Sequence, residues 1–220
     1  MNIPLLVPSM PTAQELLPWL EKIDHNRWYT NYGPLNAQFE RELARIIPCA
    51  GELALTTVSN CTVGLELALT ELGLAPGARV LIPAITFVAT GTSVLRAGFV
   101  PVLADVDPDT WLMTPDIARR ALAQGPLDAV MPVSTFGLAQ DVAARDEFSD
   151  QTGLPVVIDA AGAMGNQGVG RRTTVVFSLH ATKSLGCGEG GVVASRDAGL
   201  IGRIRRATNF GIDLESPIGE

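Results

Sequence analysis

Residues 79–106 read RVLIPAITFVATGTSVLRAGFVPVLADV, and this stretch of the sequence indicates the fold class. Apolar runs at 79–83 and 100–106 predict two strands. Between them, the pattern at 87–97 predicts a helix that ends at Gly98. Parallel strands need a crossover of this kind, usually a helix. The stretch therefore predicts a βα unit of a largely parallel sheet.

The same alternation of apolar runs and helical patterns continues on both sides of this stretch. It predicts a mostly parallel seven-stranded sheet flanked by helices, an α/β fold. Two further helices are expected, at 61–72 and at 114–123, where Thr114 caps the helix and Pro115 occupies its first turn. The remaining strands are predicted at residues 53–58, 128–133, 155–159, 173–178 and 191–195.

The N-terminal part of the chain, to about residue 50, has a helical pattern instead. Thr12 and Glu15 have the spacing of a capping box, and Pro18 is expected to kink the helix that they open. A turn-rich aromatic segment at 28–34 precedes a second helix. The apolar residues of the first helix are Leu16, Leu17, Leu20 and Ile23, and those of the second are Leu35, Phe39, Leu43 and Ile46.

Length and composition restrict the class of protein. The 220 residues can form one sizeable core, and a hydrophobic content of 47% is too high for a disordered chain. We therefore expect one domain. The formal net charge of −7 leaves no broad basic surface, so we expect no nucleic-acid partner, and we interpret Arg203, Arg205 and Arg206 as a solvated helix face.

Membrane spans, disulfides and metal sites are not predicted. No apolar run is long enough to span a membrane, and residues 1–4 (MNIP) lack the basic start of a signal peptide, so we expect a cytoplasmic protein. Three cysteines without a CxxC spacing and only two histidines predict neither a disulfide framework nor a metal centre.

Candidate site residues follow the predicted strands, because ligands of open α/β sheets bind at the carboxyl ends of the strands. Asp159 ends an otherwise apolar strand, and a buried carboxylate needs a cationic partner. A protonated pyridine nitrogen, an arginine or a helix N-terminus would each serve. The turn at 58–62 opens a helix and suits a phosphate, although an ordinary helix cap explains it better by itself.

Lys183 is the strongest single signal. The chain contains 14 arginines but only two lysines, Lys22 and Lys183. Arginine stays protonated and cannot form a Schiff base, whereas lysine can act as nucleophile and base. Lys183 lies 24 positions after Asp159 and just before the glycine-rich segment 186–191. This placement favours chemistry over a chance surface lysine.

A nucleotide-binding α/β domain is the alternative that the glycines leave open. No GxxxxGK[ST] motif occurs, and Gly186, Gly188 and Gly191 follow a loop that already carries Lys183 instead of opening a dinucleotide-binding unit.

Together these residues resemble the DegT/DnrJ/StrS-type sugar aminotransferases, which belong to the pyridoxal-phosphate-dependent transferases of fold type I. The resemblance implies that residues 1–220 form the large domain, without the small C-terminal domain of family members. The segments that carry it are 28–35 (WYTNYGPL), 60–65, 83–90 (PAITFVAT), 105–110 (DVDPDT), 157–163 (VIDAAGA) and 177–191 (FSLHATKSLGCGEGG).

The resemblance implies a role for each matching residue. Lys183 would hold pyridoxal phosphate as a Schiff base and move the substrate proton when it is free. Asp159 would pair with the ring nitrogen, and Phe87 would stack on the ring. The phosphate contacts are implied for Cys61, Thr62 and Ser178.

The implied activity is amino transfer from an amino acid, for which we expect glutamate, to a nucleotide-linked keto-sugar. The implied setting is polysaccharide or amino-sugar biosynthesis, and the implied assembly is a homodimer. A chain that binds the cofactor without turnover is the second hypothesis, and a nucleotide-binding domain without the cofactor is the third.

The sequence departs from the family pattern at three positions. Cys61 stands where glycine is common, Ser134 where histidine is frequent, and Gly162 where glutamine or histidine usually touches the cofactor. A related dehydratase branch has histidine in place of the lysine, so Lys183 argues against that branch.

Overall fold

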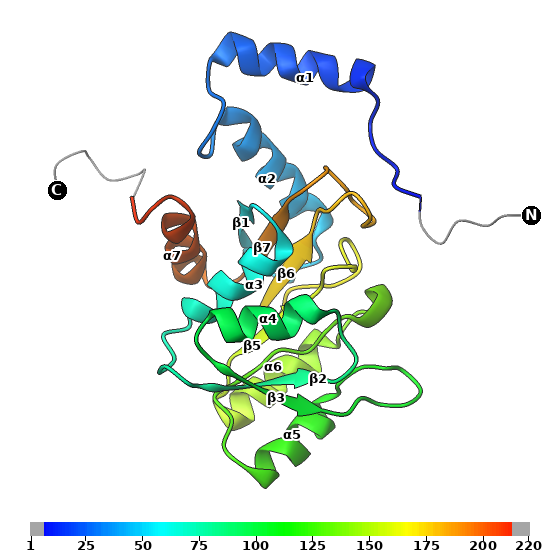
Figure 1. The fold of residues 1–220 in the computed structure, drawn as a ribbon, viewed down its shortest axis with the longest axis vertical. Coiled ribbons are helices and arrows are strands. Elements are labelled where there is room, and N and C mark those ends of the chain that lie inside the picture. The colour runs from blue at the N-terminus through cyan, green and yellow to red at the C-terminus, as the bar shows by residue number, and fades with distance from the viewer. Residues whose placement is uncertain (1–6, 213–220) are drawn as a thin grey trace, which may run out of the picture.

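The computed structural model describes residues 7–212, which form a seven-stranded sheet between two layers of helices (Figure 1). The expectation for residues 1–4 lies outside the described part. The strands are β1 (Ala54–Val58), β2 (Arg79–Pro83), β3 (Val100–Ala104), β4 (Ala129–Val130), β5 (Val156–Asp159), β6 (Thr173–Ser178) and β7 (Gly191–Ser195). The helices are α1 (Ala13–Asn26), α2 (Pro34–Ile46), α3 (Cys61–Thr70), α4 (Val88–Arg96), α5 (Pro115–Gln124), α6 (Val142–Thr152) and α7 (Ala198–Thr208), with a short 3₁₀ turn at Thr135–Gly137.

The strand order is β1-β7-β6-β5-β4-β2-β3. Five neighbouring strands of the sheet run parallel, namely β6, β5, β4, β2 and β3. Strand β7 runs antiparallel to both β6 and β1. The predicted fold class is confirmed. Because the carboxyl ends of parallel strands lie at one edge, Asp159, Ser178 and the segment after β2 come together there. Gly191, which opens β7, pairs with both Val58 and Ser178 at the same edge.

Two hydrophobic cores cover the two faces of the sheet. One contains side chains of α2, α5 and α6, and the other contains side chains of α3, α4 and α7. Along β6, Val175 and Phe177 belong to the first core and Val176 to the second. Successive side chains of a strand point to opposite faces, which explains why the apolar residues 175–177 of this strand are consecutive.

The helix caps follow the predicted signals. Thr12 and Glu15 form the capping box of α1, and the Thr114 hydroxyl accepts from the Ile117 N–H at the start of α5. Pro18 lies inside α1, which continues to Asn26.

Three features differ from the sequence-based expectations. The strand predicted at 128–133 forms a ladder only at Ala129–Val130, because Pro132 has no N–H to donate, and Val133 then pairs with Asp159 as an isolated bridge. Ile46 is 48% exposed, whereas its neighbour Ile47 is 4% exposed and takes the core position expected for Ile46. Helix α6 was expected only as a helix between two predicted strands, without bounds. Its buried residues are Arg145, Phe148 and Ser149, which leaves little apolar periodicity to detect.

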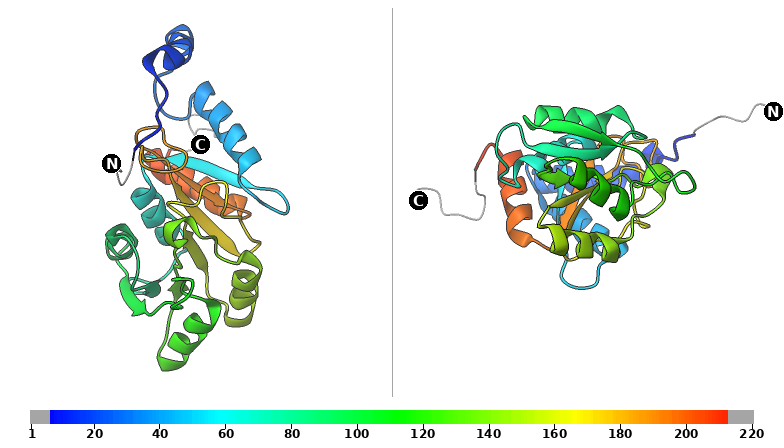
Figure 2. Two further views of the ribbon diagram at one scale, coloured as in Figure 1. Left: turned by 90° about the vertical axis from the view of Figure 1, so that its right-hand side faces the viewer. Right: turned by 90° about the horizontal axis from the view of Figure 1, so that it is seen from below.

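Helix α1 stands away from the sheet (Figures 1 and 2). None of its side chains is buried, and Leu16, Leu17, Trp19 and Leu20 are each more than 40% exposed. No helix among residues 7–212 has the length and apolar character needed to cross a membrane.

Candidate functional site

A pocket of about 590 Å³ opens at the carboxyl edge of the sheet. The start of α3, the segment before α4, the end of β5 and the loop after β6 all contribute to its lining. Six residues that the sequence singled out line this one pocket: Cys61, Thr62, Phe87, Asp159, Ser178 and Lys183. Their roles stay predictions, but the structure brings all six together.

The first turn of α3 offers backbone donors to the pocket. The Asn60 side chain caps the helix by accepting from the Val63 N–H at 2.9 Å. The first N–H groups of a helix have no acceptor within the helix, so those of Cys61 and Thr62 are available to an anion. Asn60 was not predicted as a site residue, although it is a favourable capping residue ahead of an apolar helix.

Gly191 lets this turn lie against the sheet. A Cβ atom at position 191 would lie 2.7 Å from the carbonyl carbon of Asn60 and 2.8 Å from the Cys61 nitrogen. Real Cβ atoms do not approach backbone atoms so closely, so only glycine fits here. The anion-binding turn and the start of β7 are therefore packed backbone to backbone.

Ser178 lies at the end of β6 with its hydroxyl ready to donate. The Ser178 Oγ accepts from the His180 N–H at 3.2 Å and is 5% exposed as a residue. Because a hydroxyl accepts without spending its own proton, the Ser178 proton is available to a phosphate oxygen.

Asp159 is buried at the floor of the pocket. Its Oδ2 accepts from the Thr90 hydroxyl at 2.6 Å, and its Oδ1 accepts from the Ala161 N–H at 3.2 Å. Burial raises the pKa of this carboxyl, while the two hydrogen bonds and the charge of Lys183 oppose the rise. Thr90 was missed from the sequence because it lies 69 positions from the carboxylate, and no local pattern joins the two.

Lys183 lies on a compact loop that follows β6. The loop is closed by backbone hydrogen bonds from Ala181 N to Gly188 O and from Leu179 N to Gly190 O, both at 2.9 Å. Gly186 packs against Ala181, where a Cβ atom would meet the backbone at 3.0 Å. The glycines of this segment thus shape the loop that presents the lysine to the pocket.

Cys61 contributes a neutral thiol. Burial and the nearby Asp159 charge raise its pKa well above the ordinary value, and Lys183 only partly opposes them. The side chain therefore acts as a small apolar group beside the turn, and not as a thiolate.

Phe87 occupies the N-cap position of α4 and lines the pocket, and the residue is 79% exposed. An exposed aromatic face at the mouth of a polar pocket is suited to pack on a planar ligand.

The two other departures from the family pattern differ in their surroundings. Ser134 is buried and donates to the Gln167 side chain at 2.8 Å, so its hydroxyl belongs to an internal polar cluster and not to the pocket lining. At Gly162 a Cβ atom would meet only the Gly137 backbone, at 3.7 Å or more, so the site has room for a side chain.

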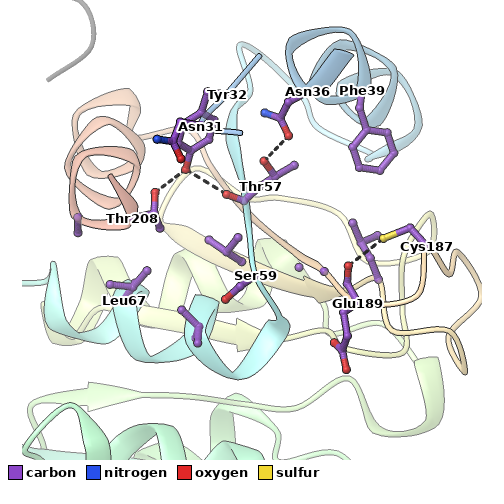
Figure 3. Close-up of a pocket in the computed structure, with 16 residues that line it drawn as sticks. Asn31, Tyr32, Asn36, Phe39, Thr57, Ser59, Leu67, Cys187, Glu189 and Thr208 are labelled. Carbon is purple, nitrogen blue, oxygen red and sulfur yellow. Dashed lines mark hydrogen bonds between the residues drawn. The ribbon is translucent and has the colours of Figure 1, made fainter. Parts of the chain in front are cut away.

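A second pocket of about 650 Å³ lies between α2, α7 and the loop after β6 (Figure 3). It shares Val63 and Glu189 with the first pocket. Tyr32 lies at the top of this pocket in Figure 3 and donates to the Thr57 carbonyl at 3.2 Å. Although this pocket is larger, none of the six candidate residues lines it. The chemistry therefore points to the pocket around Lys183.

The residues of the smaller pocket fit the cofactor that the resemblance implies. Backbone N–H groups and hydroxyls match a phosphate, a buried carboxylate matches a protonated ring nitrogen, an exposed phenyl ring matches a planar ring, and an amine matches a carbonyl.

Comparison with known proteins identifies the family. Residues 12–217 match the model of the DegT/DnrJ/EryC1/StrS aminotransferase family. A Bacillus cereus ATCC 10987 protein described as a PLP-dependent aminotransferase is 33% identical, with a TM-score of 0.88 over 100% of this chain and 61% of its own.

Two further solved structures are similar. DesI, solved in the presence of its TDP-sugar product, is 33% identical, with a TM-score of 0.83 over 95% of this chain and 54% of its own. The Bacillus subtilis protein NtdA, solved with bound cofactor PMP, is 25% identical, with a TM-score of 0.78 over 94% of this chain and 49% of its own. The chain thus spans 49–61% of the length of these three proteins.

Proposed function

Because the chain belongs to the DegT/DnrJ/EryC1/StrS aminotransferase family, we propose that it is the large domain of a pyridoxal-phosphate-dependent aminotransferase. The observation that supports this most directly is the convergence of Lys183, Asp159 and the first turn of α3 on one pocket. In this proposal residues 1–220 carry the cofactor.

The cofactor would be held at three points. The N–H groups of Cys61 and Thr62, with the Thr62 and Ser178 hydroxyls, would bind the phosphate. Asp159 would pair with the ring nitrogen, and Phe87 would cover the ring. When bound, pyridoxal phosphate supplies an electron sink that stabilises negative charge at the amino-acid carbon.

Lys183 would provide the covalent attachment and the acid–base group. Its amine would hold the cofactor covalently. When free, the same amine would move the proton at the amino-acid carbon. Asp159, as an anion, would keep the ring nitrogen protonated.

We propose an amino acid, expected to be glutamate, as donor and a nucleotide-linked keto-sugar as acceptor. The family, together with DesI solved with a TDP-sugar product, supports this acceptor class. The proposed setting is amino-sugar or polysaccharide biosynthesis in the cytoplasm by a homodimer.

The half-reaction with glutamate tests the proposal. We expect purified protein loaded with pyridoxal phosphate to lose its visible absorbance band on addition of glutamate and to release 2-oxoglutarate. Lys183→Arg should release none, while Lys22→Arg, which changes the other lysine of the chain, should behave as wild type. A loaded protein that keeps its band and releases no keto acid would support cofactor binding without turnover instead.

A further inference from the structure

The surroundings of Asp159 contain a hydroxyl for which the sequence predicts no role. Thr90 on α4 is fully buried and donates to Asp159 Oδ2 at 2.6 Å. Among residues 7–212 it supplies the one side-chain hydrogen bond described for this carboxylate, beside the Ala161 N–H on the other oxygen.

A second hydroxyl extends this hydrogen bond into a chain. Thr86 Oγ1 lies 2.6 Å from Thr90 Oγ1. A hydroxyl carries one proton, and Thr90 gives its proton to Asp159. Thr90 must therefore accept from Thr86, so the two hydroxyls point in sequence toward the carboxylate.

The reverse direction is less favourable. If Asp159 were protonated and donated to Thr90, the chain of hydroxyls would run outward and end on the Phe87 carbonyl, which lies 3.3 Å from Thr86 Oγ1. This final contact is long for an O–H···O bond, while the contact between Thr90 and Asp159 has the short length of a charge-assisted one. The geometry favours the arrangement in which Asp159 is an anion.

The N-terminal turn of α4 also favours the anionic form of Asp159. Thr90 is the third residue of α4, and Phe87 is its N-cap. The N-terminal turn of a helix carries partial positive charge, which stabilises a nearby carboxylate.

We propose that Thr90 is a positioning residue for Asp159, with Thr86 orienting its hydroxyl, so that a buried carboxylate stays an anionic acceptor for the ring nitrogen of the cofactor. This inference rests on the proposed function for the identity of that cofactor. It assigns to the segment 86–90 two tasks, because Phe87 lies between the two threonines and is the residue expected to cover the ring.

Other charged and titratable groups face the same pocket and belong in the interpretation of any pH effect. They are Cys61 on α3, Arg96 on α4, and His180, Lys183 and Glu189 on the loop after β6. Since Thr90→Val changes none of these groups, a shift that it causes reports on the hydroxyl.

Cofactor affinity tests the proposal. Thr90→Val is nearly isosteric and replaces the hydroxyl, which donates to Asp159 and accepts from Thr86, by a methyl group. We expect it to weaken binding of pyridoxal phosphate about tenfold or more, the effect of losing one hydrogen bond to a charged group. For an analogue of pyridoxal phosphate with CH in place of the ring nitrogen, the affinities of Thr90→Val and wild type should differ by less than about threefold, because this analogue offers Asp159 no hydrogen-bond partner.

Two controls complete this experiment. Thr90→Ser keeps the hydroxyl and should stay within about threefold of wild type for both ligands. Thr174→Val removes a buried hydroxyl that donates to the neutral Ser195, and should leave both affinities unchanged. Equal weakening of both ligands in Thr90→Val would overturn the proposal, because it would mean that Thr90 only packs the pocket.

A measurement on the cofactor-free protein separates this inference from the proposed function. We expect ¹³C NMR of the Asp159 carboxyl, assigned with Asp159→Asn, to titrate about one to two pH units higher in Thr90→Val than in wild type. Thr86→Val should shift the midpoint in the same direction by less, since the direct donor remains. An unchanged midpoint in Thr90→Val would contradict the proposal, whether or not the protein binds pyridoxal phosphate.

Discussion

At the scale of single residues, Asp159 combines two opposed demands. A carboxylate that serves a ring nitrogen must be charged, yet burial raises its pKa by penalising the charge. Thr90, the Ala161 N–H and Lys183 offset part of that penalty. We therefore expect charged Asp159 to lower the stability of the folded protein, a cost that its role in the pocket explains.

Asp159→Asn tests this balance. The folded-state pKa of Asp159 lies above its unfolded value, so the folded protein binds the proton more tightly. Stability from this group is present below the unfolded pKa, near 4, and is lost as the pH rises through the folded pKa. Urea unfolding of the cofactor-free protein should show that the free energy of unfolding of Asp159→Asn, relative to that of wild type, is higher at pH 8 than at pH 4. The same difference at both pH values would contradict the assigned cause.

At the scale of elements, the site depends on close contacts between backbone segments. Strand β7 begins at Gly191 directly beside the turn of Asn60 and Cys61. A second element, the segment between β4 and α6, is held by buried amides: Gln140 Nε2 donates to Val133 O at 2.7 Å, and Gln167 Oε1 accepts from Ser134 and from the Gln140 N–H.

Gly191→Ala should disturb the anion-binding turn. The added methyl group would overlap backbone atoms at 2.7–2.8 Å, so the turn or the strand must shift. We expect cofactor affinity, measured by titration of the visible band, to fall about tenfold or more. Gly202→Ala on α7 is the matched control, since its Cβ would meet nothing within 4 Å. That variant should keep its affinity and gain up to about 1 kcal/mol of stability. An unaltered affinity in Gly191→Ala would show that the contact is not needed.

Arg145 anchors α6 to this segment. It is fully buried and donates to Gln140 Oε1 and to the Met113 carbonyl, and burial lowers its pKa to about 10. Truncation leaves both acceptors buried without a donor, so Arg145→Ala should lower the free energy of unfolding by about 3 kcal/mol or more. Arg120→Ala, at an exposed position of α5, should change it by less than about 0.5 kcal/mol. Denaturant titration of the two variants compares them, and similar losses would contradict the buried-anchor role.

The elements show how far the sequence alone could be interpreted. Buried strands such as β6 were predictable, because a strand covered on both faces contains consecutive apolar residues, here residues 175–177. The caps at Thr12 and Thr114 were predictable from local pairs. The six pocket residues were predicted from strand ends and from the resemblance. Thr90 and the Gln140–Arg145 contacts were not predictable, since their partners are set by packing between distant segments.

At the scale of the whole molecule, α1 is the helix that does not pack against the sheet. It extends from the body (Figure 2), and none of its residues is buried. An amphipathic helix without a buried face suggests a contact with another surface. The proposed homodimer provides such a surface.

The oligomeric state tests that interpretation. We expect wild-type protein to sediment as a dimer and the double variant Leu17→Glu, Leu20→Glu to shift toward monomer, because charge on the exposed apolar side chains opposes their burial. Gln14→Glu adds charge at an exposed polar position of the same helix and should leave the dimer intact. A monomeric wild type, or a double variant that sediments as wild type, would contradict this role of α1.

The central claim is that Lys183 carries the cofactor, and borohydride reduction followed by peptide mass mapping tests it most directly. After incubation with pyridoxal phosphate, the phosphopyridoxyl adduct is expected on the peptide containing Lys183, and it should disappear in Lys183→Arg but persist in Lys22→Arg. An adduct confined to Lys22, or no adduct on wild-type protein, would contradict the account.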